Sequence, residues 1–342
     1  MNRHVFLITG VNGEIGHSLI AYLREKYPDA DIIAFDIADI DTKLLKYEPR
    51  FYNGNVLDQK LIERIFQQNE IDCIFHLASL LSTRAEKVPE FAHEVNVIGS
   101  LNILHAAAEA SLRIGRRVKV IFPSSIAVYG LPNLKEKHLA GQVKENQYLS
   151  PIAMYGCNKR SVECLGEYYS RYYKLTERTG ESPLLPDFRC VRFPGLISAI
   201  TMPTGGTSDY GPEMLHFAAR GEHYDCFVRP DSKISFMAMP DAIKSLIGIA
   251  EAEPNDLKQS VYNVTSFSLT ASEFLDIVRS NFPDADIDFV PNPNRQAIID
   301  SWPEDTDDSA ARRDWSWCPD YDCRKAFEEY LVPAIKERYA AQ

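Results

Sequence analysis

Tyr155 and Lys159 are the residues of this sequence whose types and spacing most directly predict proton-transfer chemistry. They stand four positions apart, so on a helix both side chains leave the same face. Ser150 followed by Pro151 is typical of a helix start, and we expect the helix to begin there. A phenol has a pKa of ~10 in water, and a neighbouring ammonium group lowers it. The pair is therefore a candidate proton shuttle, although the same spacing also occurs by chance on surface helices.

A glycine-rich turn near the N-terminus predicts a nucleotide-binding site. The strand expected at Val5–Thr9 leads into Gly10-Val11-Asn12-Gly13-Glu14-Ile15-Gly16, and a helical pattern follows. Glycines in such a turn let the backbone approach a pyrophosphate at the helix N-terminus. A second expected strand, Ile32–Phe35, ends in Asp36, whose carboxylate would accept the ribose hydroxyls of NAD and repel the 2′-phosphate of NADP. We expect NAD, because a purely structural turn would not require this acid.

Strands and helices alternate through the first two thirds of the chain. Cys73–Leu77 is an apolar strand, in which we expect His76 to be packed and hydrogen-bonded. The strand Val118–Phe122 ends in Ser124 and Ser125, at the kind of strand end where parallel sheets bind ligands. Serines that cap a turn are the alternative interpretation. The alternation predicts an α/β fold with a Rossmann-type doubly wound parallel sheet.

Two polar stretches and one long helix complete the pattern. Residues 131–149 are rich in Lys and Glu and are expected to be a solvated excursion before the Tyr155 helix, which should continue to about Thr179. The acid-rich run Glu304–Asp308 lacks the glycine and the bidentate glutamate of a calcium loop, so we expect a solvated helix start. The long helical stretch Glu90–Ile114 carries Asn96, whose amide would brace a neighbouring strand or face solvent.

The composition excludes several classes of protein. The 342 residues are 45% hydrophobic, enough for one large domain or two interlocked ones. The net charge of −11, without a block of like charges, argues against nucleic acid and membrane partners. The apolar runs are strand-sized, and no signal peptide is expected. Seven scattered cysteines without zinc spacing predict reduced thiols, a cytoplasmic protein and no metal site.

The glycine turn, Asp36, the Ser-Ser strand end and the Tyr155/Lys159 pair occur in the order that is typical of the extended short-chain dehydrogenase/reductases, which this chain resembles. Within that group, nearly the whole chain resembles the short-chain, zinc-independent L-threonine 3-dehydrogenases. The runs that carry this resemblance are His76–Ser82, Arg192–Ser198, Gly205–Tyr210, Met239–Ala242, Ser301–Pro303 and Asp307–Arg312.

The resemblance implies a role for individual residues. Tyr155 would be the general base, Lys159 would hold the nicotinamide ribose and lower the pKa of Tyr155, and Ser125 would bind the reacting oxygen. The residues implied to bind NAD are Gly10, Asn12, Gly13, Ile15, Gly16, Asp36, Ile37, Asn55, Val56, Leu77, Ala78, Asn96, Tyr155, Lys159 and Leu196. The residues implied to bind the substrate are Ser82, Ser125, Tyr155, Thr207, Ser208, Asp209 and Trp302.

The implied activity is NAD-dependent oxidation of L-threonine to 2-amino-3-oxobutyrate by hydride transfer. The alternative is a nucleotide-sugar 4-epimerase or dehydratase, but such relatives typically read Arg-Tyr-Phe-Asn where this chain has Arg192-Phe193-Pro194-Gly195. A third interpretation is a non-catalytic NAD-binding regulator, which need not retain Ser125, Tyr155 and Lys159. The chain departs from the L-threonine 3-dehydrogenases at Asn55, where they usually have Asp, and at Ser79, where they usually have Ala.

The resemblance also implies a division of the chain. We expect an NAD-binding Rossmann domain of residues 1–196 plus about 235–266, and a smaller, mostly C-terminal substrate-binding part of about 197–234 and 267–342. The expected partner is a small amino-acid substrate. A homodimer is expected, because this superfamily often dimerises through a four-helix contact that would include the Tyr155 helix and its tyrosines at 168, 169, 172 and 173. The excursions at 131–149 and 174–187 are longer than is usual in the family.

Overall fold

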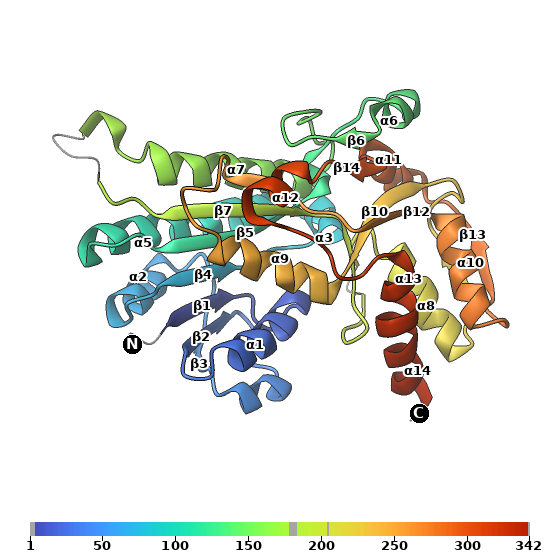
Figure 1. Ribbon diagram of the computed structural model, residues 1–342, viewed down its shortest axis with the longest axis horizontal. Helices are drawn as coiled ribbons and strands as arrows, with labels where there is room; N and C mark the ends of the chain where they lie inside the picture. The colour runs from blue at the N-terminus through green and yellow to red at the C-terminus, as the bar shows by residue number, and fades with distance from the viewer. Residues whose placement is uncertain (1–3, 178–182, 204, 341–342) are drawn as a thin grey trace.

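The centre of the molecule is a seven-stranded, all-parallel sheet in the order β11-β7-β5-β4-β1-β2-β3 (Figure 1). The structure is a computed structural model that describes residues 4–177, 183–203 and 205–340. The strands are β1 (Val5–Thr9), β2 (Asp31–Asp36), β3 (Arg50–Asn53), β4 (Cys73–His76), β5 (Lys119–Ser125), β7 (Asp187–Phe193) and β11 (Val261–Asn263). The order reverses between β1 and β4, and such a switch point opens a crevice at the carboxyl ends of the strands.

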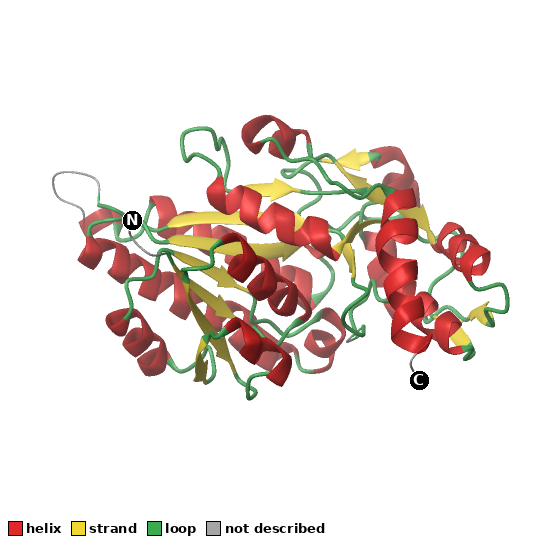
Figure 2. Ribbon diagram, turned by 60° about the horizontal axis from the view of Figure 1, so that its bottom comes forward, coloured by secondary structure: helices red, strands yellow, loops and turns green. Residues whose placement is uncertain are grey.

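Helices cover both faces of this sheet (Figure 2). Alternate residues of β1 point to opposite faces, so Phe6 and Ile8 pack with α1 and α9, whereas Leu7 packs with α2, α5 and α7. The helices around the sheet are α1 (Glu14–Lys26), α2 (Gln59–Gln68), α3 (Ser82–Lys87), α4 (Pro89–His93), α5 (Gly99–Ile114), α7 (Met154–Arg171), α9 (Met239–Glu251) and α12 (Ser309–Trp315). The shorter helical turns are η1 (Thr42–Tyr47), η2 (Glu94–Ile98), η3 (Ile126–Val128) and η4 (Leu175–Glu177). The predicted doubly wound, Rossmann-type α/β fold is confirmed.

A smaller part of the molecule lies at one end of its long axis, on the right in Figure 1. Its largest sheet contains β8 (Gly195–Ile197), β10 (Lys233–Ala238) and β12 (Phe267–Thr270). Two-stranded sheets pair β9 (Tyr224–Cys226) with β13 (Ile287–Phe289), and β6 (Gln142–Val143) with β14 (Asp305–Thr306). Its helical segments are α6 (Leu134–Ala140), α8 (Tyr210–Arg220), α10 (Ala271–Asn281), α11 (Pro293–Ser301), α13 (Cys323–Lys325), η5 (Ala326–Leu331) and α14 (Val332–Ala340).

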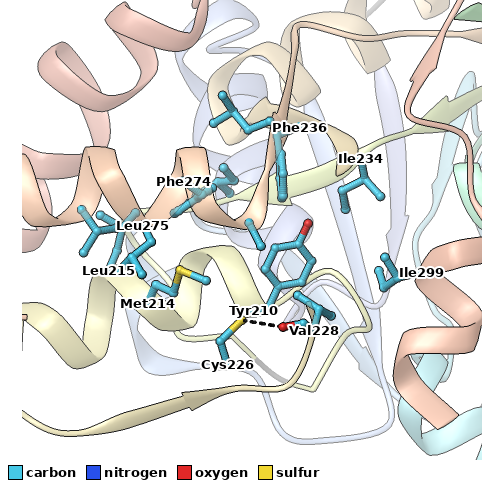
Figure 3. Packing of buried hydrophobic residues seen from close by; sticks show 14 of the residues in the cluster. Tyr210, Met214, Leu215, Cys226, Val228, Ile234, Phe236, Phe274, Leu275 and Ile299 are labelled. Atoms are coloured by element: carbon cyan, nitrogen blue, oxygen red, sulfur yellow. Dashed lines mark hydrogen bonds between the residues drawn. The ribbon is translucent and has the colours of Figure 1, made fainter. Parts of the chain in front are cut away.

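The core of the smaller part is built around a fully buried tyrosine. Figure 3 shows Tyr210 surrounded by Met214 from α8, Phe236 from β10, Phe274 from α10 and Ile299 from α11. The strand β10, which we expected in the Rossmann domain, belongs to this second sheet, whereas β11 belongs to the large one. The division into domains stays a prediction. Across the described ranges, the helices all fall short of the length and apolarity needed to cross a membrane.

The Tyr155 helix is shorter than predicted at both ends. It begins at Met154 and not at Ser150, because the chain first makes a tight turn against Gly130: a Cβ atom on Gly130 would lie 1.8 Å from the carbonyl oxygen of Ser150. The N–H of Met154 is then capped from outside the helix by the Glu86 carboxylate. The helix ends at Arg171, and Thr179, the predicted end, lies outside the described residues.

The prediction that residues 131–149 form a solvated excursion holds for most of their side chains, which are exposed or half-buried, but the segment is also structured. It contains α6 and β6, and Leu131, Lys137 and Val143 are buried. The reason is tertiary: β6 pairs with β14, which is far away in the sequence. At Glu304–Asp308 the predicted helix start is observed, since Asp308 is the N-cap of α12, but the run is not solvated: it supplies β14, and Thr306 and Asp308 are buried. Its last residue, Asp308, is mostly buried and binds Arg312 and the indole N–H of Trp317.

Candidate active site

Tyr155 and Lys159 lie on one face of α7, as their spacing predicts. The Lys159 ammonium nitrogen is 5.4 Å from the centre of the Tyr155 ring and 4.5 Å from the centre of the Phe122 ring. It donates a hydrogen bond of 2.7 Å to the carbonyl oxygen of Pro123, near the end of β5. Since α7 packs against β5, the helix brings both side chains to the carboxyl end of the central sheet, where the crevice lies.

Burial shifts the pKa of both groups. Removal from water raises the pKa of the Tyr155 phenol and lowers the pKa of the Lys159 ammonium group to about 8, the latter against the opposing influence of Cys190 and Glu163. The prediction that Lys159 lowers the pKa of Tyr155 stays a prediction: the ammonium group donates its hydrogen bond to Pro123, and burial is the dominant influence at the phenol. A cationic nicotinamide ring bound beside Tyr155 would favour the phenolate.

Ser125 is the last residue of β5 and is half-buried. Its Oγ accepts a hydrogen bond of 3.1 Å from the N–H of Ala127, so it caps the short turn η3, and its hydroxyl hydrogen can still be donated to a ligand. The preceding serine has a different task. The hydroxyl of Ser124 donates to the Glu163 carboxylate at 2.7 Å and is fully enclosed. Of the two serines, Ser125 is the one whose position suits contact with a substrate.

The glycine turn fits a pyrophosphate group. Gly10 has φ +72°, and a Cβ atom there would lie 2.7 Å from the backbone nitrogen of Ala78, so only glycine allows β1 and the chain after β4 to approach so closely. A Cβ atom on Gly16 would lie 2.3 Å from the carbonyl oxygen of Val11. Gly13 caps α1 without any side-chain hydrogen bond, which leaves the N-terminal N–H groups of the helix for an anion.

Asp36 lies directly beside this turn. One of its carboxylate oxygens accepts the N–H of Asn12 at 3.0 Å and the other accepts the N–H of Ala38 at 3.1 Å. The Asn12 side chain in turn binds the backbone of Asp39 and Asp41, so it holds the loop after β2 against the turn. The carboxylate is half-exposed and keeps free lone pairs for ribose hydroxyls. This geometry fits NAD and disfavours the 2′-phosphate of NADP.

Several of the remaining residues predicted to bind the cofactor directly follow strands of the central sheet. Asn96, on the π-helical turn η2, braces the backbone of Leu80 through both its oxygen and its amide nitrogen and also accepts from Ser79. Its predicted bracing role is therefore observed. Ile37 is 68% exposed after β2, and Val56 is buried against Gly99. The others are placed as follows: Asn55 after β3, Leu77 and Ala78 after β4, Ile15 in the first turn of α1, and Leu196 in β8.

Two segments that were predicted to bind the substrate meet directly. The Oγ of Ser82, the first residue of α3, accepts hydrogen bonds from the backbone N–H and the hydroxyl of Thr207 at 2.9 and 3.0 Å. Asp209 uses one carboxylate oxygen to hold the N–H groups of Gly205 and Gly206, so it shapes this loop. Ser208 lies in the same loop, and Trp302 is buried at the end of α11, in the same core cluster that Tyr155 packs against. Thr204, at the start of the predicted loop, lies outside the described residues.

The sequence interpretation missed two carboxylates. Glu163 is fully buried, where it binds both Ser124 and Arg192; its place four residues after Lys159, on the same helix face, could have indicated it. Glu14, inside the glycine turn, binds Thr201. His76 is packed as predicted, with its ring between the hydroxyls of Thr9 and Ser100. In the described part of the chain, no group of three or more His, Cys, Asp or Glu side chains could hold a metal ion.

Residues 6–186 match the NAD dependent epimerase/dehydratase family. The chain belongs to this family. It is 34% identical over 318 residues to the mitochondrial L-threonine 3-dehydrogenase of Bos taurus, covering 92% of this chain and 79% of that one. Its structure superposes on a monomeric L-threonine 3-dehydrogenase from a metagenome, in the apo form, with a TM-score of 0.85 at 33% identity, covering 98% and 99% of the two chains. The L-threonine dehydrogenase of Clostridium difficile gives a TM-score of 0.86 at 31% identity over 99% of both chains.

These similarities confirm the family-level predictions. The chain is an NAD-dependent enzyme of the epimerase/dehydratase family, and its resemblance to L-threonine 3-dehydrogenases extends over nearly the full chain. NAD is its cofactor, in agreement with the open N-terminus of α1 and the position of Asp36. The family includes both epimerases and dehydratases, so the reaction has to be argued from the site.

Proposed function

We propose that this protein oxidises L-threonine at its hydroxyl-bearing carbon, with NAD⁺ as hydride acceptor, and that it produces 2-amino-3-oxobutyrate. The similarity to L-threonine 3-dehydrogenases over almost the whole length of both chains is the observation that carries this proposal. It covers the smaller part of the molecule as well as the NAD-binding sheet. The smaller part contains Thr207, Ser208, Asp209 and Trp302, which would contact the amino acid together with Ser82, Ser125 and Tyr155 of the larger part.

The proposed roles follow from the placement of the side chains. Tyr155, as phenolate, would take the proton of the substrate hydroxyl while the hydride leaves the same carbon and the carbon–oxygen double bond forms. Lys159 would hold the nicotinamide ribose, and its charge would favour the phenolate. Ser125 would donate its hydroxyl hydrogen to the reacting oxygen. Bound NAD⁺ supplies the hydride acceptor, and the protein's task is to orient the carbon against it.

The substrate's charged groups would be bound by the loop that carries Thr207, Ser208 and Asp209, together with Ser82 and Trp302. The contact between Ser82 and Thr207 supports this assignment, because it joins the loop to α3 beside the end of β4. We accordingly propose that the smaller part, about 197–234 and 267–342, binds the substrate, and that residues 1–196 with about 235–266 bind NAD. In the epimerase alternative, an amide after β7 would contact the sugar nucleotide, but this chain has Pro194 and Gly195 there.

An absorbance assay tests the function. Purified protein would be mixed with NAD⁺ and L-threonine, and NADH formation followed, with D-threonine and other 3-hydroxy amino acids as comparisons. We expect NADH with L-threonine, and none from Tyr155→Phe, which should still bind NAD⁺ because the ring that packs in the site is retained. Absence of NADH with threonine and all these analogues would overturn the proposal. Tightly retained NAD with turnover of a UDP-sugar would establish the epimerase instead.

We also propose a homodimer that forms through the outer surface of the helices over one face of the sheet. Exposed apolar side chains gather on these elements: Phe91 on α4, Ile98 on η2, Leu112 on α5, and Tyr168 and Tyr172 near the end of α7. Exposed apolar patches of this kind are typical of interaction surfaces. Light scattering would show the mass of a dimer, and Ile98→Glu would reduce it to that of a monomer. A wild-type monomer would contradict this proposal, and the metagenomic relative is described as monomeric.

A cytoplasmic location is proposed from the cysteines. All seven are free thiols, both the buried Cys73, Cys190 and Cys226 and the more exposed ones. Reduced thiols are typical of the cytoplasm. Fractionation of cells that express the protein, with immunodetection in each fraction, would test this.

A further inference from the structure

Lys137 is a lysine that is buried although it lies in a mostly polar segment. It belongs to α6, within the excursion at 131–149, and only 2% of the residue is exposed. Its ammonium nitrogen donates a hydrogen bond of 2.9 Å to the carbonyl oxygen of Ile299, 162 positions later in the chain. In the part of the chain that the structure describes, this carbonyl group is its hydrogen-bond partner, and it forms no ion pair.

The acids that act electrostatically on Lys137 have other partners. These are Asp300 and Asp231, which pair with Arg229, and Glu304, which pairs with His138. Burial removes an ammonium group from water at a large cost in free energy, and one neutral carbonyl group returns only part of it. A methionine of similar length would fill the same space without this cost. The charge of Lys137 is therefore not explained by the stability of the fold.

The carbonyl group that Lys137 binds lies at the end of α11. The last carbonyl groups of a helix lack partners within it, and the helix dipole is negative there, so a cation suits this position. Trp302 is the C-cap residue of α11, and its N–H donates to the same Ile299 oxygen at 3.1 Å. Lys137 and the backbone of Trp302 thus share one acceptor. Because Trp302 also binds it, loss of the lysine would leave no unpaired carbonyl oxygen behind.

The rest of the excursion holds the same stretch of chain. The N–H of Leu131 donates to the carbonyl oxygen of Ser301 at 2.8 Å, directly before Trp302. Strand β6 pairs with β14, shortly after Trp302, and Figure 1 shows α6, β6, β14 and α11 side by side. Leu131 itself follows Ser125 by six positions. The excursion therefore connects the end of β5 to Trp302, whose ring is buried in the core cluster that Tyr155 packs against.

We propose that Lys137 is a positioning residue: its buried ammonium group, bound to the end of α11, fixes the side chain of Trp302 for contact with the amino-acid substrate. The contact of Trp302 with the substrate rests on the proposed function. The positioning of Trp302 rests only on the hydrogen bonds at Ile299 and Ser301, so the two can be tested apart.

Fluorine NMR tests the positioning without any substrate. In Lys137→Met the side chain keeps its volume but loses the charge and the donor. Lys135→Met is the matched control, because Lys135 is an exposed lysine of the same helix. Labelling with fluorotryptophan places one signal on each tryptophan of the chain, Trp302, Trp315 and Trp317, and Trp302→Phe assigns the first. We expect Lys137→Met to shift or broaden the Trp302 signal alone, and Lys135→Met to change none.

Kinetics and unfolding separate this role from a structural one. In Lys137→Met we expect KM for threonine to rise by about tenfold, as for the loss of a substrate contact, while the Kd of NAD⁺ stays unchanged. Urea unfolding should show no loss of stability, because the buried charge is removed together with its desolvation cost.

Three results would overturn the proposal. An unchanged Trp302 signal in Lys137→Met would remove the positioning, and failure of this variant to fold would give the ammonium group a structural role instead. A changed signal with an unchanged KM would remove the link to the substrate. The NMR measurement needs no threonine, so an inactive wild type would refute the proposed function and still leave the positioning of Trp302 decided.

Discussion

Arg192 and Glu163 form a fully buried, bidentate ion pair. The Arg192 Nε lies 2.8 Å from one Glu163 carboxylate oxygen and its Nη2 lies 2.7 Å from the other. The first oxygen also accepts from Ser124, the neighbour of Ser125. The pair thus joins α7, which carries Lys159, to two strands. These are β5, which ends in Ser125, and β7, which leads into β8.

Removing one partner of this pair should destabilise the fold strongly. Arg192→Met would leave the buried Glu163 carboxylate with Arg160 as its remaining cation and without its bidentate partner, and we expect the free energy of unfolding to fall by about 3–5 kcal/mol. Urea unfolding followed by circular dichroism measures this. The exposed pair Arg324–Glu328 on the C-terminal helices is the control, because Arg324→Met should cost less than about 1 kcal/mol. Equal losses of unfolding free energy in the two variants would show that the buried pair stabilises the fold no more than the exposed pair does.

The pH dependence of kcat/KM should depend on Lys159. Since burial lowers its pKa to about 8, the ammonium charge is present below that pH and is lost as the pH rises through it, which should produce a falling limb in the free enzyme. Lys159→Met should lower kcat/KM by about 10²-fold and remove the falling limb. Initial rates across the pH range measure this, with the exposed Lys60→Met as control; a falling limb that persists unchanged would assign it to another group.

Asp36 should decide the choice between NAD and NADP. In Asp36→Ser the carboxylate that we propose to accept the ribose hydroxyls is lost, and we expect kcat/KM for NAD⁺ to fall by about 10–100-fold, as for loss of a charged hydrogen bond. Use of NADP⁺ should rise at the same time, because the repulsion of its 2′-phosphate is removed. Steady-state rates with both cofactors measure the change. The nearby, exposed Asp39→Asn should leave the preference as it is; a similar shift there would mean that net charge alone decides it.

The contact between Ser82 and Thr207 should affect the amino acid and not the cofactor. Ser82→Ala removes the oxygen that accepts both hydrogen bonds from Thr207, so the substrate loop loses its anchor on α3. We expect KM for threonine to rise by about 5–50-fold, in line with the loss of one or two hydrogen bonds, while the Kd of NAD⁺ stays unchanged. Kinetics and a separate NAD⁺ titration test this against the exposed Ser280→Ala. An equal effect on NAD⁺ binding would place Ser82 in the cofactor site.

Local patterns predicted the parts of the site that consist of neighbouring residues. The glycines at 10, 13 and 16, the acid at 36 and the pair at 155 and 159 were recognisable because each works within a single turn or helix. The predictions failed where the partner is distant in the chain. The helix start at Ser150 was displaced by the approach of Gly130, and Val143 in the excursion at 131–149 is buried where β6 pairs with β14. Burial, which no local pattern measures, raises the pKa of Tyr155 and lowers that of Lys159.

The sequence by itself determined the class of fold, the cofactor and the chemical types of the proposed catalytic groups, because strand–turn–helix signals and side-chain spacing are properties of contiguous residues. The tertiary structure alone decided what surrounds these groups. It brought the Lys159 ammonium group to the carbonyl oxygen of Pro123 and paired the Glu163 carboxylate with Arg192. It also formed the hydrogen bonds of Thr201 with Glu14 and of Thr207 with Ser82. Each of these contacts joins segments that are separate in the sequence, and packing of the whole chain is what removes them from water and brings them within hydrogen-bond distance.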